Sequence, residues 1–191
     1  MSSTGAEESL NISSPIRDDS KRLAEDEALR QMVEELFVRC ELRVGRYLAQ
    51  MVRDRALAED LLQDSFHDAL RSRADLPSVR NHEAWLYGIA RNRALAALRR
   101  RRRFAGALGR LASLHRDARE EEELVAVRDL LERHLSPEDQ ALVLLRYLHD
   151  FDANELAEMT GLTPEAVRQR LSRARRRLVD AAQLDTKGEQ G

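Results

Sequence analysis

The segment from Asp152 to Leu178, DANELAEMTGLTPEAVRQRLSRARRRL, constrains the fold more than any other part of the chain. Its first residues, 155–160, predict a short helix, and Gly161 follows where a left-handed residue commonly ends one. Thr163 and Pro164 then supply an N-cap and a first-turn proline for a second helix. Two helices joined by so tight a turn predict a helix-turn-helix, so DNA is the first partner to test.

The second of these helices has two chemically different faces. At about 100° per residue, an apolar stripe forms on one face, while arginine, glutamine, serine and one glutamate lie opposite. Arginine and glutamine have the bidentate geometry that base edges in the major groove require. A basic helix face is often only solvated, but the preceding helix, turn and cap favour DNA reading here. The apolar stripe consists of Val167, Leu171, Ala174 and Leu178.

Composition fits small helical modules with local basic clusters. The 191 residues are 42% hydrophobic, 35% charged and 4% aromatic. The net charge of −2 gives no global basic signature, so a case for nucleic acid depends on local clustering. Residues 79–110 hold nine arginines against one glutamate, and residues 165–178 hold six against one. Residues 1–36 instead hold nine acidic against four basic side chains.

Cysteine content and hydropathy favour a cytoplasmic chain. Cys40 is the single cysteine, which excludes an intramolecular disulfide. No apolar run approaches the roughly 20 residues that a membrane span requires, and the N-terminus lacks a signal-peptide pattern. We therefore expect no direct membrane insertion. Residues 1–27 are rich in Ser, Glu and Asp and are expected to form a flexible or weakly helical acidic leader.

Two helices are expected after this leader. Apolar residues recur at three- and four-residue spacing from about residue 28 to 50, which places Cys40 in a core. Asp54 can cap a second helix that runs to about Arg73. The face of this helix away from the core is acidic and is bordered by Leu57 and Leu61. Such a face is typical of a protein-binding surface, although a merely solvated face explains the periodicity about as well. The polar members of this face are Asp60, Gln63, Asp64 and His67.

A third helix is expected to begin at Asn81, after a loop at residues 75–80, and to run into the five arginines at 99–103. Asn92 lies on the same side as Trp85 and Ile89, which puts an amide on an apolar stripe. A structural asparagine with satisfied hydrogen bonds is an equally good interpretation. For Trp85 a core anchor is favoured over a platform for base stacking.

A second helical block follows a linker. Residues 105–119 have a weak apolar pattern and are expected to be a flexible linker. A helix with apolar residues from Leu124 to Leu135 follows, and Ser136 and Pro137 then act as the cap and first-turn proline of the next helix. That helix would support the helix-turn-helix.

Catalysis has little support in the sequence. No phosphate-binding glycine loop, nucleophile motif or paired metal-ligand spacing is present, so we expect no enzyme, cofactor or metal site. An enzyme acting on DNA or nucleotides with a metal at Asp60 and Asp64 is a minor alternative. A self-sufficient helix-turn-helix repressor or activator is the stronger one. The five histidines are interpreted as surface or capping residues: His67, His82, His115, His134 and His149.

The order of these segments resembles bacterial RNA polymerase sigma factors of the extracytoplasmic-function (ECF) type. The resemblance covers about residues 34–179 and rests on AEDLLQDSF, AWLYGIARNRAL, the arginine run, LSPEDQALVLLRYL and the closing helix-turn-helix. It implies an all-α protein with two small helical domains joined by a flexible linker. Residues 28–104 would be a region 2-like domain that binds the clamp helices of the largest polymerase subunit and melts the minus-ten element. Residues 120–184 would be a region 4-like domain that binds the flap of the other large subunit and the minus-thirty-five element, and residues 185–191 a flexible tail.

The resemblance also assigns residues to these contacts by matching positions. Polymerase would bind the face formed by Leu57, Asp60, Leu61, Gln63, Asp64 and Phe66. An unstacked base of the minus-ten element would be captured near Arg80, Trp85, Arg91, Asn92 and Arg93. The minus-thirty-five element would be read by Thr163, Glu165, Arg168, Gln169, Ser172, Arg173 and Arg176.

Departures from the family pattern limit what can be transferred. Ala96 stands where the family often has aspartate, and the tryptophan common at the end of the second helix is absent, so the promoter sequence does not transfer. The resemblance further implies a role in a stress response and an anti-sigma factor that covers both blocks. Such a partner could hold this otherwise cytoplasmic chain at the inner membrane.

Overall fold

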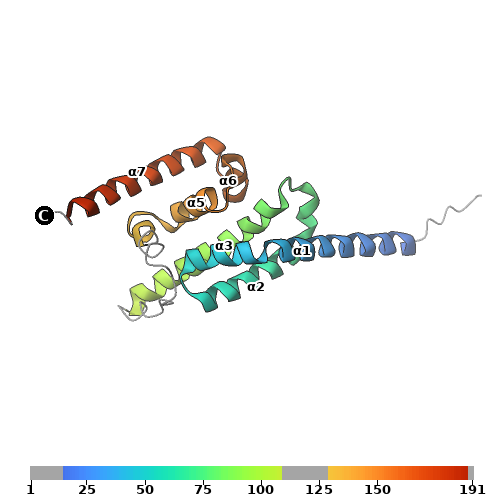
Figure 1. The fold of residues 1–191 in the computed structure, drawn as a ribbon. Coiled ribbons are helices and arrows are strands. Elements are labelled where there is room, and N and C mark those ends of the chain that lie inside the picture. The colour runs from blue at the N-terminus through green and yellow to red at the C-terminus, as the bar shows by residue number, and fades with distance from the viewer. Residues whose placement is uncertain (1–14, 109–128, 189–191) are drawn as a thin grey trace, which may run out of the picture.

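The computed structural model describes residues 15–108 and 129–188, and within these ranges every regular element is a helix (Figure 1). The predicted all-α class is therefore confirmed. The first domain consists of α1 (Pro15–Val52), α2 (Arg55–Arg71), η1 (Arg73–Ser78) and α3 (His82–Leu108). The second consists of a helical turn at 129–134 and the helices α5 (Pro137–Tyr147), α6 (Ala153–Thr160) and α7 (Pro164–Gly188).

The core of the first domain lies between the C-terminal half of α1, α2 and α3. Val33, Val44 and Leu48 of α1 are fully buried, and Cys40 is 4% exposed, as the apolar spacing predicts. The rings of Phe37 and Phe66 meet with centroids 4.5 Å apart and join α1 to α2. Burial of these side chains fixes the positions of the polar faces that α2 and α3 present outward.

The N-terminal part of α1 lies in the segment that was expected to be flexible or weakly helical. The helix begins at Pro15, so residues 15–27 of the expected leader are helical. The remaining leader residues, 1–14, lie outside the described part of the chain. A proline suits the first turn of a helix, and Lys21 and Glu25 form an i,i+4 ion pair at 3.8 Å. Asp26 also accepts two hydrogen bonds from the Arg73 guanidinium, at 2.7 and 2.8 Å, which tie the helix to η1. This part of α1 projects beyond the rest of the domain (Figure 1).

The predicted caps and turn of the second domain are confirmed. Ser136 accepts a hydrogen bond from the Asp139 amide at 3.2 Å. An additional cap, not predicted, is the capping box of Asp152 and Glu155 at the start of α6. Gly161 ends α6 with φ of 70°, a left-handed conformation in which a β-carbon would be strained. Thr163 accepts a hydrogen bond from the Ala166 amide at 3.1 Å and so caps α7.

Two boundaries of the expected linker and tail also move. α3 continues to Leu108 and α7 to Gly188, so residues 105–108 and 185–188 are helical where flexible segments are expected. Strong helix formers, arginine, alanine and leucine, dominate the preceding turns and propagate both helices. Residues 109–128 and 189–191, with the apolar pattern at Leu124, lie outside the described residues.

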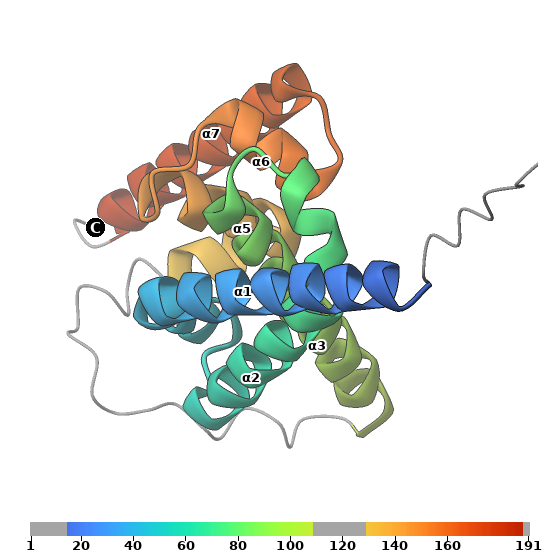
Figure 2. The same ribbon diagram turned by 90° about the vertical axis from the view of Figure 1, so that its right-hand side faces the viewer.

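The two domains pack against each other. α6 lies against α3, and α5 contacts both α1 and α3 (Figure 2). At one edge Arg53 forms ion pairs with Asp129, at 2.5 Å, and with Glu132. At the other edge the Asn81 side-chain amide donates to the Glu155 carboxylate at 2.5 Å. These contacts bring the start of α3 beneath the first helix of the helix-turn-helix.

Among residues 15–108 and 129–188, no helix has the length and apolar character that crossing a membrane requires.

Candidate nucleic-acid and polymerase interfaces

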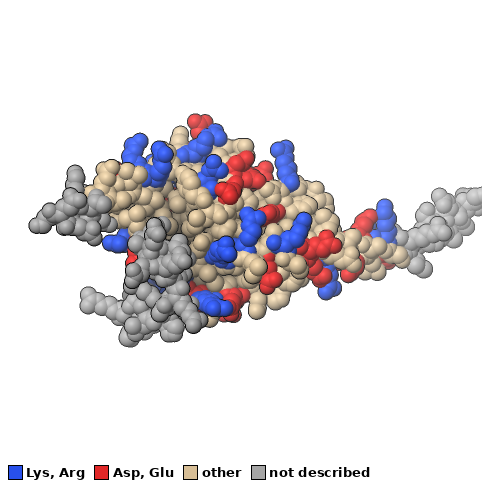
Figure 3. Space-filling model, viewed as in Figure 1, with Lys and Arg blue, Asp and Glu red and all other residues tan. Residues whose placement is uncertain are grey.

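The predicted DNA-reading face lies on the exposed side of α7. Val167, Leu171 and Ala174 are buried against α5 and α6, which turns the opposite side of the helix to solvent. Arg170 does not belong to this exposed face, because its guanidinium binds Asp139 of α5 at 2.8–2.9 Å and holds α7 on the domain. Basic side chains lie along α7 at the upper edge of the molecule in Figure 3. Every predicted minus-thirty-five residue is exposed: Thr163, Glu165, Arg168, Gln169, Ser172, Arg173 and Arg176.

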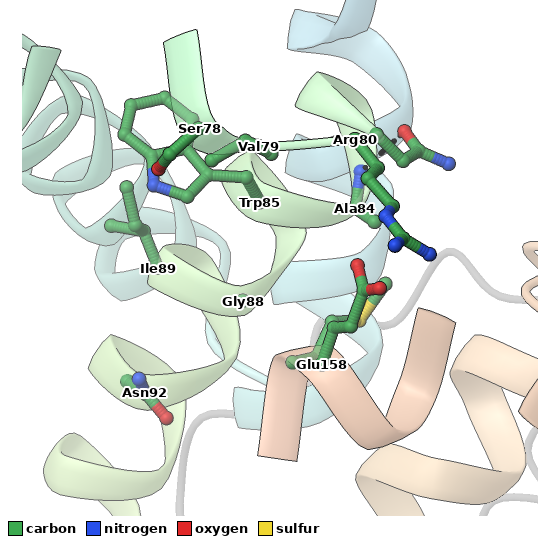
Figure 4. A pocket seen from close by; sticks show the side chains of 11 residues that line it. Ser78, Val79, Arg80, Ala84, Trp85, Gly88, Ile89, Asn92 and Glu158 are labelled. Carbon is green, nitrogen blue, oxygen red and sulfur yellow. Dashed lines mark hydrogen bonds between the residues drawn. The ribbon is translucent and has the colours of Figure 1, made fainter. Parts of the chain in front are cut away.

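A pocket of about 460 Å³ lies at the start of α3, where the predicted minus-ten site was expected (Figure 4). It brings Arg80, Trp85 and Asn92 together. Trp85 is half-buried: it packs against the core, as the favoured interpretation predicts, and it also lines the pocket. Asn92 is exposed, and its side-chain oxygen accepts a hydrogen bond from the Arg91 guanidinium at 3.3 Å. The first-domain lining consists of Ser78, Val79, Arg80, Asn81, Ala84, Trp85, Gly88, Ile89 and Asn92.

The second domain forms one wall of this pocket. Glu158 and Met159 of α6 complete the lining, and Arg80 and Glu158 point toward one another across it (Figure 4). Gly88 lies against α6, and a β-carbon there would be in ordinary van der Waals contact with the Met159 α-carbon, at 3.7 Å. Asn81 has two roles, since its oxygen caps α3 by accepting from the Ala84 amide at 3.0 Å while its nitrogen donates to Glu155. The helix-turn-helix domain thus stands across the pocket.

Two of the predicted minus-ten residues lie elsewhere. Arg91 is 8% exposed and sits in the interface between the domains, where burial lowers the pKa of its guanidinium. Arg93 turns to α2 and binds Asp68 at 2.5 Å and Asp64 at 3.4 Å. The hydrogen bond from Arg93 lowers the pKa of the Asp68 carboxyl group. Neither arginine lines the pocket: Arg93 joins α3 to α2, and Arg91 is buried.

The predicted polymerase-binding face of α2 is acidic and open. Asp60, Gln63 and Asp64 are exposed, while Leu57 and Phe66 are half-buried beside them. Leu61 is 6% exposed and belongs to the core, so it supports the helix rather than forming part of its outer surface. The cap at Asp54, which accepts from the Leu57 amide at 3.1 Å, sets where this face begins.

The structure reveals one buried polar residue that the sequence pattern misses. His149 is 6% exposed, so its interpretation as a surface or capping residue is wrong. Its Nδ1 lies 2.9 Å from the Tyr87 hydroxyl and its Nε2 3.4 Å from Gln50 Oε1, both in the first domain. These partners lie 62 and 99 positions away in the sequence, beyond the reach of any local pattern. His115 lies outside the described residues.

No group of three or more His, Cys, Asp or Glu side chains is arranged to hold a metal ion in the described ranges.

A helix-turn-helix whose second helix exposes a row of arginines, together with a separate helical domain, defines a two-domain protein of the helix-turn-helix class. Comparison with known proteins agrees. The family model for Sigma-70 region 2 matches residues 36–104, and that for Sigma-70, region 4 matches residues 125–178.

Similarity to two RNA polymerase sigma factors extends this agreement. The RNA polymerase sigma factor CarQ of Myxococcus xanthus is 34% identical over 149 residues, which cover 76% of this chain and 86% of that protein. The probable RNA polymerase sigma factor RfaY of Xanthomonas campestris is 31% identical over 147 residues, 71% of this chain and 36% of that protein. The chain belongs to the sigma-70 family of RNA polymerase sigma factors and is of the ECF type. It is a transcription initiation factor, and a self-sufficient helix-turn-helix regulator is not favoured.

Two solved structures share the fold. The sigma factor RpoE of Bartonella quintana, in complex with the anti-sigma factor NepR, matches with a TM-score of 0.64 and 22% identity, over 80% of this chain and 97% of that one. CnrH in complex with the cytosolic domain of CnrY matches with a TM-score of 0.60 and 23% identity, over 84% and 97%.

Proposed function

We propose that the exposed face of α7 reads the minus-thirty-five element while the pocket at the start of α3 captures an unstacked base of the minus-ten element. The observation that carries this proposal is the division of α7 into a buried stripe and an open face at all seven predicted positions. A major groove admits one α-helix, and Arg168 and Gln169 can each make a bidentate contact to a base. Arg175, Arg176 and Arg177 are exposed further along the helix, where they can contact phosphates.

The pocket has the chemistry that an extruded base requires. Trp85 offers an aromatic face for stacking, Asn92 offers an amide with a donor and an acceptor, and Arg80 offers a cation for the adjoining phosphate. Removing a base from the duplex takes a few kcal/mol, and a pocket of this kind stabilises the open strand by a comparable amount. Promoter melting is then a consequence of binding. It requires no covalent chemistry and no cofactor, so we propose that the chain is not an enzyme.

The acidic face of α2 is the proposed contact with core polymerase. Asp60 and Asp64 are exposed carboxylates that would pair with basic side chains on the clamp helices of the largest subunit. The second domain would bind the flap of the other large subunit, so that the two domains hold neighbouring parts of one promoter. The family resemblance, together with this exposure, supports the assignment.

An anti-sigma factor is a further proposed partner. The sigma factor RpoE, which has a similar fold, was solved in complex with the anti-sigma factor NepR. We propose that this chain works in the cytoplasm and that an anti-sigma factor holds it inactive until a stress releases it. If that anti-sigma factor is anchored in the inner membrane, the inactive chain is held there with it.

The test is transcription in vitro with core polymerase that lacks its own sigma subunit. The chain should bind core, start transcripts at defined promoters and make the minus-ten region reactive to permanganate. Asn92→Ala should reduce that reactivity while leaving core binding intact, and Asp60→Ala should weaken core binding. A DNA footprint equally strong without core enzyme would instead support a self-sufficient regulator, and metal-dependent turnover abolished by Asp60→Ala would support an enzyme.

A further inference from the structure

A buried polar cluster joins the two domains, and neither the DNA-reading face nor the acidic face of α2 uses it. Its centre is the His149 side chain, from the segment between α5 and α6. Tyr47 of α1 and Tyr87 of α3 enclose the imidazole, with ring centroids 5.6 and 5.2 Å from it. Phe151 packs on the Tyr87 ring at 4.8 Å, so the second domain contacts this tyrosine from two sides.

The hydrogen bonds of the cluster suit a neutral imidazole. The tautomer with its proton on Nε2 donates to Gln50 Oε1, and Nδ1 is then free to accept from the Tyr87 hydroxyl. A proton added at Nδ1 would remove the acceptor that the Tyr87 hydroxyl uses. Protonation therefore breaks the 2.9 Å hydrogen bond in its present direction across the interface.

The surrounding charges also oppose a cation at this position. Burial is the main cause that lowers the pKa of His149, to about 4, and two arginines of α1 lower it further while Asp150 opposes them. On α3, Glu83 lies beside Tyr87 but is engaged with Arg43 at 2.5 Å. The titratable and charged groups around the imidazole are thus Arg43, Arg46 and Tyr47 of α1, Glu83 and Tyr87 of α3, and Asp150 of its own segment.

Some buried polar groups around the cluster also lack the hydrogen-bond partners that a permanent core provides. The Tyr47 hydroxyl and the Arg91 Nε are buried without a hydrogen-bond partner. A buried polar group without a partner is destabilising, and water would satisfy both groups if the domains parted. Direct polar ties at the edges of the interface are few and ionic or carboxylate-based, such as those between Asn81 and Glu155 and between Arg53 and Asp129. Contacts between domains of one chain commonly open, and this one has the composition to do so.

We propose that the cluster is an acid-sensitive latch: protonation of His149 parts the two domains and frees the first-domain side of the pocket from the wall that Glu158 and Met159 of α6 now form. The part of this proposal that concerns DNA rests on the function proposed above for the pocket. The parting of the domains does not depend on it.

The direction and size of the effect follow from proton linkage. An imidazole whose pKa is lowered in the latched form stabilises that form above its ordinary pKa of about 6.5, and this stability falls as the pH drops toward the latched value of about 4. The ratio of open to latched molecules should therefore rise about tenfold between pH 7.5 and pH 5.5.

The latch can be tested with a thiol placed under α6 in the full chain. In Met159→Cys the sulfur takes the place of a side-chain atom that lies against Gly88, so parting of the domains should speed its alkylation. An exposed thiol in Ser172→Cys corrects for the pH dependence of the chemistry. Cys40, buried in the core of the first domain, reports global unfolding within the same molecule when labelled sites are identified by peptide mass spectrometry. The corrected alkylation rate at position 159 should rise about tenfold from pH 7.5 to pH 5.5 while Cys40 stays unlabelled.

Two histidine variants complete the experiment. His149→Gln keeps an acceptor and a donor but cannot titrate, so the rate at position 159 should change less than about twofold over this range. His134→Gln, at an exposed position of the same domain, should keep the full rise. The proposal is overturned by a flat rate in the chain with His149, by an equal rise in His149→Gln, or by parallel labelling of Cys40. None of these readouts involves DNA, so they leave the proposed role of the pocket to the transcription assay.

Discussion

The two surfaces proposed to contact DNA are treated in opposite ways by the rest of the chain. On α7 all seven candidate side chains are exposed, and none of them is covered by the first domain. At the start of α3 the pocket with Trp85 and Asn92 has α6 as one wall. A helix that reads duplex DNA can be presented on a rigid surface, whereas a pocket for an unstacked base can be shielded until a domain moves. In the free chain, the exposed face of α7 should therefore be more accessible to DNA than the pocket at the start of α3.

The largest effect is expected from a change on the buried side of α7, which holds the exposed face of that helix in place. Leu171 lies on the buried side of α7 one residue before the exposed Ser172. Leu171→Ala should lower the free energy of unfolding of the second domain by about 2–5 kcal/mol, because it removes buried methyl groups and leaves a cavity. Urea denaturation measures this loss, and Ser172→Ala, the matched exposed change, should stay within about 0.5 kcal/mol. Equal losses for both variants would contradict the division of α7 into two faces.

A smaller effect is expected on the reading side of the same helix. Arg168→Ala should reduce holoenzyme affinity for the minus-thirty-five element by about 1–3 kcal/mol if Arg168 makes a bidentate base contact. Binding titrations with the recognised and a scrambled element at fixed salt measure it. The same loss on both DNAs would assign Arg168 to a phosphate instead.

The effect of α6 on DNA binding at the pocket can be tested by a change of charge. Glu158→Gln removes an exposed carboxylate at the pocket wall, and it should raise the affinity of the free chain for single-stranded minus-ten DNA by about 0.5–1 kcal/mol, since a like charge no longer opposes the phosphates. Fluorescence anisotropy with a labelled oligonucleotide measures this gain. Glu59→Gln on α2 is the matched control and should give none. A loss of affinity in Glu158→Gln would show that Glu158 helps rather than hinders.

The smallest effect concerns the ion pair between α2 and α3. Asp68→Asn should lower stability by less than about 1 kcal/mol at neutral pH, because the pair with Arg93 is partly exposed. The hydrogen bond from Arg93 lowers the pKa of Asp68, so this contribution is present above the ordinary value of 3.8 and is lost as the pH falls through the lower folded value. Urea denaturation at pH 7 and at pH 2 should show a difference between the two chains that shrinks in acid. If the difference in the free energy of unfolding stayed the same at both pH values, packing and not charge would be its cause.

Local chemistry explains why much of the second domain could be predicted. Ser136, Gly161 and Thr163 act on neighbouring backbone groups, so their roles as caps and turn residue are visible in sequence. The open face of α7 follows from helical periodicity in the same way. The partner of each of these residues lies within a few positions along the chain.

Contacts distant in sequence set the limit of such prediction. Arg91 and Arg93 share a short motif with Asn92, yet one is buried under the second domain and the other binds α2. His149 is polar and lies in a turn, which locally predicts exposure, but Tyr87 and Gln50 enclose it from another domain. The attachment of the leader helix to η1 could not be predicted for the same reason, since the bond from Asp26 to Arg73 links positions 47 apart.

The length of α1 has a consequence for how the protein melts. Its 38 residues form a rod of about 57 Å, but only the C-terminal half is built into the core. A helical segment with so little packing is only marginally stable by itself and frays from its free end. Circular dichroism should therefore show a gradual loss of ellipticity on warming, well below the cooperative transition that probes of the buried interior, such as Cys40, would record.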